Sequence, residues 1–425
     1  MKIPKQFFTI SLFLILALVT VDGFWGTPVI IDGPDAVGEN PSLAVDVWDS
    51  LHVSYYDSTN SNLKYAVRLS TAWACETVDD SGDVGYYSSI ALDSNNLPHI
   101  AYYSAFPDYN LKYAYWNGVS WFIETVDSDA SDVGQCCSIA IDQNDFPRIA
   151  YFDSTNRDLK YASFDGVKWN FEIVDSTGMV GEYTDIKIDS NNHSHITYTE
   201  FQKYDLKYAK FNGSAWEIST IDSAGMVGEY TSLALDSNDL PRISYKGEGL
   251  RFAYFNGSEW FTEIVDSKDF VGQYTALTLD SNDKPHISYY DWEYETVRYA
   301  YFADFFWIIQ VPDSVSMRGK GTSIGTLSSN KPVIIYHDYN AWDLLSIDSD
   351  RGKPMLEWLG TENYESDGVH RDTGYEGQTF FFRVKYIEEN NFQPFQNFPK
   401  VHIESNSITG SFTMLPEDPD DLNYI

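Results

Sequence analysis

The chain repeats one alternation of apolar and polar positions, which is clearest between residues 81 and 128. Runs such as SSIALDSN, LPHIAYYS and LKYAYW alternate β-branched, aromatic or small residues with others, and turn sequences rich in Asp, Asn and Gly separate them. Asn117-Gly118, a hairpin turn sequence, then leads into SWFIETVD. This spacing is typical of strands and not of helices, so the pattern predicts a unit of four short antiparallel strands.

The unit recurs along the chain, and the residue before the central Ile or Val of the second strand shows its period. Successive copies lie about 47 residues apart. This position holds His52, His99, Arg148, His195, Arg242, His286 and Val333. Four-stranded units at this period are typical of β-propeller blades. We therefore predict an all-β fold with one seven-bladed β-propeller over residues 24–350, the seventh copy being degenerate.

The two ends of the repeated region complement each other. Residues 24–32, FWGTPVIID, resemble a fourth strand that lacks its first three. The seventh copy supplies three strands between residues 322 and 348, and the sequence then changes character. We therefore predict that the N-terminal strand completes the seventh blade and closes the ring, because closure removes the open sheet edges that favour aggregation.

Two segments fall outside the repeat. Residues 1–23 combine Lys2 and Lys5 with a short apolar run, a pattern that predicts a signal peptide and a secreted or cell-surface protein. The run is short for a membrane span, so no membrane insertion is expected after signal removal, and a retained anchor is the alternative. We expect residues 353–425, whose longer strands do not repeat, to form a small C-terminal β-sandwich of immunoglobulin type. That domain is minimal or truncated, because the fold typically takes ~100 residues.

The charge of the chain limits its partners. Its 63 acidic residues outnumber its 28 basic ones and give a formal net charge of −35. A surface of this charge repels nucleic acid and anionic membranes, so neither is expected as a partner, and the oligomeric state stays open. Cys75, Cys136 and Cys137 show no zinc-ligand spacing and are expected to be small buried hydrophobic residues.

The repeated sequence resembles uncharacterised β-propeller repeat proteins secreted by archaea and bacteria. Representative segments are YYDSTNSNLKYA at 55–66, LDSNDLPRISY at 235–245 and FNGSEW at 255–260. The ending WLGTENYESDGVHRDTGYEGQTFFFRVKY is similar to the immunoglobulin-like domain that often follows such propellers. The resemblance implies the fold and an extracellular location but no defined activity. A weaker likeness runs to the propellers of fucose-binding lectins, whose sugar sites lie between blades. No lectin motif matches residue by residue, so it assigns no site residues.

The repeat itself explains most residues that could carry chemistry. The His or Arg of the second strand could hold an anion or a metal, but its recurrence favours a bond to backbone or to the turn aspartate. The Lys or Arg that opens each third strand is expected to pair with residues such as Asp57 or Asp153. Ser323 lies in a GxSxG sequence, yet its register places it in a first strand, where no nucleophile elbow is expected. Lys187 replaces a small residue and is predicted to face the axial channel.

Two acidic turns have part of the composition of a calcium site. The sequence DSND at 236–239 and 280–283 resembles part of a calcium-binding loop but lacks its glycine and distal glutamate. We therefore expect Asx turns at both places. No catalytic residue, metal ligand or cofactor is predicted, and calcium is kept as the one alternative.

The copies differ most in the loops between second and third strands. Four of these loops depart from DSTN and carry aromatic residues with acids beside them, and in a propeller they share one rim. The residues predicted to bind a ligand are Phe106, Tyr109, Phe201, Tyr204, Trp292, Tyr294, Tyr339 and Trp342. Exposed rings suit stacking on sugars or contact with a protein, whereas rings that fold onto the rim would only be a small satellite cluster.

These observations favour a non-catalytic binding or adhesion protein that recognises a glycan or an extracellular protein through the aromatic rim. One alternative is a secreted polysaccharide hydrolase or lyase, which would need paired carboxylates in the propeller mouth. The other alternative is a structural component of the cell envelope.

Overall fold

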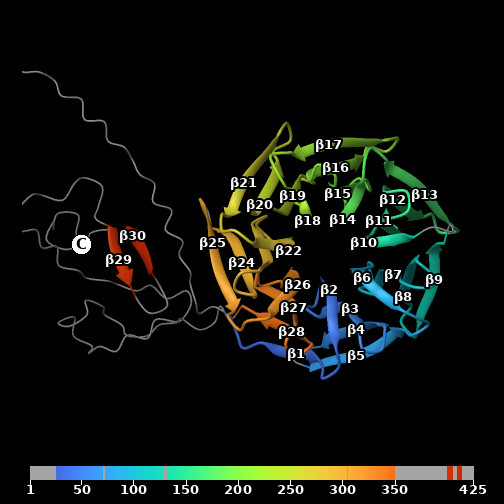
Figure 1. Ribbon diagram of the computed structural model, residues 1–425, viewed down its shortest axis with the longest axis horizontal. Helices are drawn as coiled ribbons and strands as arrows, with labels where there is room; N and C mark the ends of the chain where they lie inside the picture. Colours follow the sequence, from blue (N-terminus) through green and yellow to red (C-terminus); the bar gives the residue numbers. More distant parts are fainter. Residues whose placement is uncertain are drawn as a thin grey trace, which may run out of the picture.

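The computed structural model describes residues 25–69, 72–128, 132–303, 305–349, 400–404 and 409–413. Seven four-stranded antiparallel sheets form a ring around a central axis (Figure 1), which confirms the predicted seven-bladed propeller. The predicted signal peptide lies outside the described residues. So does the predicted sandwich over 353–425, apart from the antiparallel pair β29 (Lys400–Glu404) and β30 (Thr409–Thr413).

Each blade runs outward from a first strand beside the axis to a fourth strand at the circumference. The first strands are β2 (Val37–Val45), β6 (Val84–Leu92), β10 (Val133–Ile141), β14 (Val180–Ile188), β18 (Glu229–Leu235), β22 (Val271–Leu279) and β26 (Arg318–Thr326). The second strands are β3 (Leu51–Asp57), β7 (Pro98–Ser104), β11 (Pro147–Asp153), β15 (Ser194–Glu200), β19 (Pro241–Gly247), β23 (Pro285–Asp291) and β27 (Pro332–Asp338). The third strands are β4 (Asn62–Leu69), β8 (Asn110–Trp116), β12 (Asp158–Phe164), β16 (Asp205–Phe211), β20 (Gly249–Phe255), β24 (Thr296–Ala303) and β28 (Asp343–Asp348). The fourth strands are β5 (Ala72–Asp79), β9 (Trp121–Asp127), β13 (Trp169–Asp175), β17 (Trp216–Asp222), β21 (Trp260–Asp266), β25 (Phe306–Asp313) and β1 (Val29–Asp32).

The second strands form the centre of the packing. Every residue of β7 is buried, because neighbouring blades cover both of its faces. The core therefore consists of apolar clusters that bridge adjacent blades, and Ile100 and Tyr102 of β7 pack with Leu63 of blade 1. Gly85 makes the close approach of blades possible, because a Cβ at this residue would lie 2.8 Å from the Leu63 Cα.

The N-terminal strand closes the ring, as the sequence predicts. Strand β1 pairs with β28, and Val29 lies opposite Ser346. Just before it, Trp25 forms a bridge with Ser349 and donates its indole N–H to Gln310 Oε1 of blade 6 at 2.8 Å. The indole also packs edge-on against Tyr299 at 4.9 Å between ring centroids. The first described residues thus join blade 7 to blade 6 and complete the circle.

A buried tyrosine of the second strand joins each blade to the one before it. In all seven junctions its hydroxyl donates to the aspartate that ends the preceding fourth strand, at 2.7 or 2.8 Å. The pairs are Tyr55–Asp32, Tyr102–Asp79, Tyr151–Asp127, Tyr198–Asp175, Tyr245–Asp222, Tyr289–Asp266 and Tyr336–Asp313. Since one residue pair recurs at every interface, the sequence repeat specifies how the blades pack as well as how each blade folds.

The expected pairing of the third-strand cations within their own blade is wrong in most blades. Five of them bond the junction aspartate of the preceding blade: Lys64–Asp32, Lys112–Asp79, Lys160–Asp127, Lys207–Asp175 and Arg251–Asp222. Asp57 is occupied by its own turn, where it accepts from the backbone N–H groups of Thr59 and Asn60 at 3.1 Å. Lys160 also reaches Asp153 of its own blade at 4.0 Å, and Arg298 bonds Asp291, so these two follow the expectation.

The recurring His or Arg of the second strand faces the turn aspartate, as expected, and bonds it in blades 3, 4 and 5. Arg148 Nη2 lies 2.5 Å from Asp142 Oδ2, and His195 Nε2 lies 3.2 Å from Asp189 Oδ2. The other ring nitrogen of His195 contacts the Tyr208 hydroxyl at 2.5 Å. These side chains hold strands together inside a blade and are therefore part of the framework.

The remaining sequence expectations have mixed outcomes. Asp236 accepts from the backbone N–H groups of Asn238 and Leu240 at 2.9 Å, so the DSND turn is an Asx turn. Cys137 is buried as expected, but Cys75 is exposed because it lies on an outermost strand. The described part of the chain contains no helix with the length and hydrophobicity needed to cross a bilayer.

Candidate functional site

The loops between second and third strands lie on one face of the propeller, together with the connections between blades. In blade 2, the backbone N–H of Ala105 donates to Asp83 O at 2.7 Å, and Val133 N of the next blade donates to Tyr109 O at 3.1 Å. Equivalent bonds recur in blade 6, where Trp292 N donates to Phe270 O at 2.9 Å. We call this surface the loop face. Each loop is held at both ends, so its side chains stand on a fixed base.

The predicted ligand-binding residues all lie on the loop face and differ in exposure. Phe106 is 71% exposed, and Trp292 and Tyr294 are each 56% exposed. Tyr109, Tyr339 and Trp342 are less exposed, and Phe201 and Tyr204 are half-buried. The alternative of rings folded onto the rim therefore describes blade 4 best and blades 2 and 6 least.

The structure brings these residues together in pairs within a loop. Ring centroids are 6.1 Å apart for Phe106 and Tyr109, 5.1 Å for Phe201 and Tyr204, and 4.6 Å for Tyr339 and Trp342. Trp292 packs edge-on against Tyr290 of its own blade at 6.1 Å. Each pair stands on a separate blade, at blades 2, 4, 6 and 7, so the face presents several small aromatic platforms.

Basic side chains lie beside two of these platforms. Lys320 Nζ lies 4.4 Å from the centroid of the Tyr339 ring, and Lys268 Nζ lies 5.8 Å from that of Tyr294. Beneath the blade 7 pair, His337 is buried and its Nε2 has no hydrogen-bond partner among the described residues. Burial lowers the pKa of His337 to about 4, Asp338 opposes this shift, and Lys320 adds to it. The imidazole is therefore neutral at physiological pH.

Sequence reasoning missed a second set of aromatic residues at the centre of the loop face. Tyr87, Tyr183, Tyr230 and Tyr274, which we call the mouth tyrosines, occupy equivalent positions near the start of their first strands. They line a cavity of about 240 Å³ at the entrance to the axis. The Tyr230 ring lies 4.5 Å from that of Tyr183 and 4.8 Å from that of Tyr274, between centroids. The signal was present in the sequence, since VGxY recurs just before these first strands reach the core.

The mouth tyrosines hold an unfavourable backbone conformation. Their φ angles lie between 51 and 53°, in the left-handed region that non-glycine residues seldom occupy. In blade 7 the same position is Gly321, the residue that adopts this conformation most easily. A bulky ring kept where glycine fits better is the kind of local strain found at binding sites.

Burial keeps the mouth tyrosines protonated. It raises the pKa of Tyr87 to about 12, and burial together with Tyr230 raises the pKa of Tyr183 further above the ordinary value. Nearby, burial and then the Glu229 carboxylate raise the pKa of Glu182. The mouth thus offers phenol hydroxyl groups to a polar ligand.

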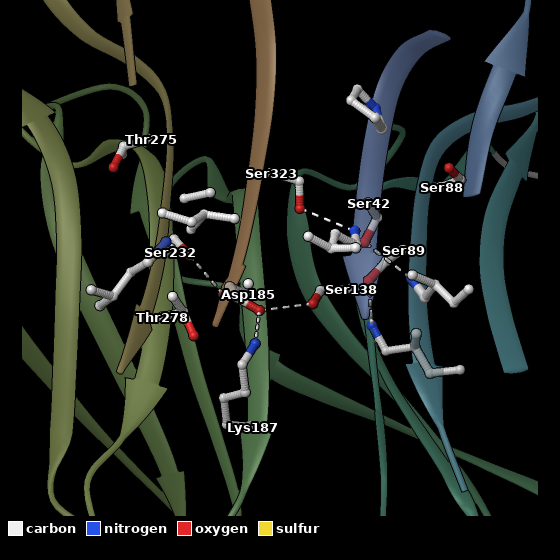
Figure 2. Close-up of a pocket in the computed structure, with 18 of the residues that line it drawn as sticks. Ser42, Ser88, Ser89, Ser138, Asp185, Lys187, Ser232, Thr275, Thr278 and Ser323 are labelled. Atoms are coloured by element: carbon white, nitrogen blue, oxygen red, sulfur yellow. Dashed lines mark hydrogen bonds and ion pairs between the residues drawn. The ribbon is translucent and has the colours of Figure 1, made fainter. Parts of the chain in front are cut away.

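Below the mouth, the axial channel has a volume of about 520 Å³ and is lined largely by serine and threonine (Figure 2). Most of its serines join the first strands of adjacent blades, since they accept a hydrogen bond from a backbone N–H of the next blade. Ser42 accepts from Ile90 N, Ser89 from Ile139 N and Ser138 from Ile186 N, each at 3.2 Å. This polar lining is therefore a structural belt.

Two residues singled out in the sequence lie in this belt (Figure 2). Ser323 accepts from Leu43 N at 3.0 Å on a first strand, as its register predicts, and has no catalytic geometry. Lys187 faces the channel, as predicted, and bonds Asp185 Oδ1 at 2.7 Å. Asp185 also accepts from Leu233 N at 2.7 Å. Among the described residues that line this cavity, Asp185 is the only carboxylate.

Among the described residues, no three His, Cys, Asp or Glu side chains are grouped closely enough to hold a metal ion. No family model matches the chain. No curated protein matches it.

Solved propellers are similar to this chain in fold. AofleA from Arthrobotrys oligospora is 13% identical with a TM-score of 0.48, and the match covers 68% of this chain and 90% of that one. The fucose-specific lectin from Aleuria aurantia is 14% identical with a TM-score of 0.47, covering 66% and 97%. YCF48, solved bound to D1 peptide, is 12% identical with a TM-score of 0.50, covering 78% and 98%. At these identities the likeness shows the propeller fold alone.

Proposed function

We propose that this protein is a non-catalytic glycan-binding protein that holds its ligand on the loop face. The observation that carries the proposal is the exposure of Trp292 and Tyr294, each 56%, on a loop whose backbone is fixed at both ends. Two large exposed rings at this position do not contribute to the core of the propeller and are typical of a binding surface. Aromatic faces stack well on the apolar face of a sugar ring.

Acidic groups beside the rings supply hydrogen-bond acceptors for sugar hydroxyls. Glu293 lies exposed between Trp292 and Tyr294, and Asp108 lies exposed between Phe106 and Tyr109. The separation of the platforms on different blades suits a branched or repeated glycan, because several weak contacts made at once add to the overall affinity. An extracellular protein partner is the second ligand class that these platforms fit.

Secretion belongs to the same proposal. It rests on the pattern of residues 1–23 and on the net charge of −35, which suits a soluble protein outside the cell. A secreted hydrolase is less well supported, because the axial cavity offers Asp185 without a second carboxylate. No cofactor is invoked.

The experiment is glycan-array binding of the whole chain, with and without calcium. We expect a restricted set of bound glycans and loss of the signal in the double variant Trp292→Ala/Tyr294→Ala. Trp48→Ala is the control, because Trp48 is 72% exposed but lies in the turn between β2 and β3, on the opposite face. A blank array would overturn the glycan proposal and favour a protein ligand.

A further inference from the structure

A second hollow lies between blades 2 and 3, away from the loop face. It has a volume of about 390 Å³ and is bounded by the turn between β10 and β11, at the opposite end of the strands from the loops described above. Its lining is mostly aromatic: Tyr113, Tyr115, Phe122, Phe146 and Phe164, with His99 at the base. Nothing in the proposed glycan site accounts for it.

Blade 2 provides one wall, and it is a stack of rings. Tyr115 stacks on Phe122 with centroids 5.4 Å apart and planes inclined by 17°, and on its other side it stacks on His99 at 5.9 Å. Phe122 is 47% exposed, so the end of the stack is open to a ligand.

Blade 3 provides the second wall, where Phe146 packs edge-on against Phe164 at 5.9 Å. A Cβ added at Gly166 would lie 2.8 Å from Phe146 Cζ, so this ring packs directly against the backbone of Gly166. The hollow is thus bounded by rings on two sides, and their electron-rich faces attract cations.

Two carboxylates add negative charge at the same place. Glu124 accepts from the Trp169 indole at 3.0 Å, and Asp145 accepts from Ser94 N at 2.8 Å and Ser94 Oγ at 2.7 Å. The lining includes no Lys or Arg to neutralise them.

The equivalent junction between blades 5 and 6 shows what this arrangement accommodates. It repeats the stack as Tyr254 on Phe261 at 5.2 Å, and it repeats the carboxylate as Glu263, which accepts from the Trp307 indole at 3.0 Å. There, Arg242 stands where blade 2 has His99, and its guanidinium carbon lies 5.7 Å from the centroid of the Tyr254 ring. The protein itself thus supplies a cation over the aromatic stack of that junction. Between blades 2 and 3 the shorter His99 leaves the corresponding space open.

We propose that the hollow between blades 2 and 3 binds an organic cation of the quaternary ammonium class, such as a choline group. The rings supply cation–π contacts, and Glu124 and Asp145 supply opposite charge. A sugar fits less well, because sugar hydroxyls need donors as well as acceptors. The lining offers few free donors, since the Tyr113 hydroxyl is already engaged with His99. The site is independent of the loop face.

The test is calorimetric titration of the whole chain with choline, its uncharged isostere 3,3-dimethylbutan-1-ol, and a methyl glycoside. We expect choline to bind at least tenfold more tightly than the isostere. Phe122→Ala and Glu124→Gln should each weaken choline binding by fivefold or more, and the Gln side chain keeps an acceptor for Trp169.

The repeat provides matched controls. His99→Arg copies blade 5, should fold because Arg242 already occupies that position, and should abolish choline binding by filling the hollow. Phe261→Ala removes the equivalent ring of blade 5 and should leave choline binding unchanged. Equal binding of the isostere or no binding of choline would each overturn the proposal, as would glycoside binding that Phe122→Ala abolishes. Retention of glycan binding by His99→Arg would show that the two sites are separate.

Discussion

The hydroxyl of Tyr102 in blade 2 donates a hydrogen bond to Asp79 Oδ2 of blade 1 at 2.7 Å, and both side chains are buried. The same aspartate accepts from Lys112. Burial by itself would raise the pKa of Asp79, but the hydrogen bonds from Lys112, Ser81 and Tyr102 outweigh it and hold the pKa below its ordinary value. The charged carboxylate therefore stabilises the junction between the two blades. The tyrosine–aspartate hydrogen bond is repeated at six further junctions.

Removing this hydroxyl should loosen the junction. Tyr102→Phe leaves the ring in place but takes one donor from a buried carboxylate, which costs about 1–3 kcal/mol. We expect a lower midpoint in guanidinium unfolding, whereas Tyr294→Phe, which alters an exposed hydroxyl, should have no effect. Equal midpoints for Tyr102→Phe and the unmodified protein would show that Lys112 alone is sufficient.

Closure of the ring by β1 can be tested on two adjacent residues. Ile31 is 6% exposed and packs with Val37 and Leu344, while Ile30 is 58% exposed. Ile31→Ala should lower the free energy of unfolding by about 2–5 kcal/mol, because it leaves a cavity at the seam. Ile30→Ala should change it little. Similar effects of the two substitutions in thermal melting would contradict the view that β1 fastens the ring.

The buried His337 gives stability a pH dependence. It is neutral in the folded protein, where its pKa is about 4, but it takes up a proton in the unfolded chain below about 6.5. The unfolded state therefore binds more protons between these values, and stability falls as the pH falls through this window, by on the order of 3 kcal/mol.

The substitution His337→Phe should flatten this part of the profile, and blade 3 already has Phe152 at the equivalent position. The measurement is unfolding by denaturant at pH 7 and at pH 4.5. His193→Gln, at a partly exposed histidine, serves as the control. If the His337→Phe variant loses as much stability on acidification as the unmodified protein, other groups are responsible.

The strain at the mouth tyrosines predicts an unusual order of melting temperatures among variants of Tyr87. Tyr87 has φ of 52° and is 38% exposed, so Tyr87→Gly relieves backbone strain of about 1–2 kcal/mol while losing few ring contacts. We expect Tyr87→Gly to melt at or above the temperature of the unmodified protein. Tyr87→Val should melt clearly lower, because a β-branched residue suits this conformation least. The reverse order in differential scanning calorimetry would rule out strain at this site.

The sequence was sufficient for the propeller because its repeat carries redundant information. The same turn aspartate, second-strand His or Arg and fourth-strand Trp mark blades 1 to 6, and Trp25 of the N-terminal segment, which lies beside Ser349, matches the fourth-strand Trp of that pattern. Pairing across blades was harder to predict. The sequence pattern offers Lys64 acidic partners in its own blade and in the preceding blade. Only the packing of the two blades shows that Lys64 pairs with Asp32.

The candidate sites were predictable only in part. The aromatic loop residues stood out because they interrupt the repeat, and the structure places all of them on one face. The mouth tyrosines were concealed because they belong to the repeat, and their significance depends on a backbone angle that composition does not reveal. The hollow beside Phe122 depends on the length of one side chain, His99 in place of Arg, which matters only once two blades are side by side.

The central claim is that the loop face binds a glycan through its exposed rings. The most direct measurement is the affinity of a glycan identified on the array, determined by titration calorimetry for the unmodified protein, Trp292→Ala/Tyr294→Ala and Trp48→Ala. We predict that the double substitution weakens binding at least tenfold without a comparable fall in melting temperature, and that Trp48→Ala does not change binding. Unchanged affinity in the double variant would contradict the assignment of the site to the loop face.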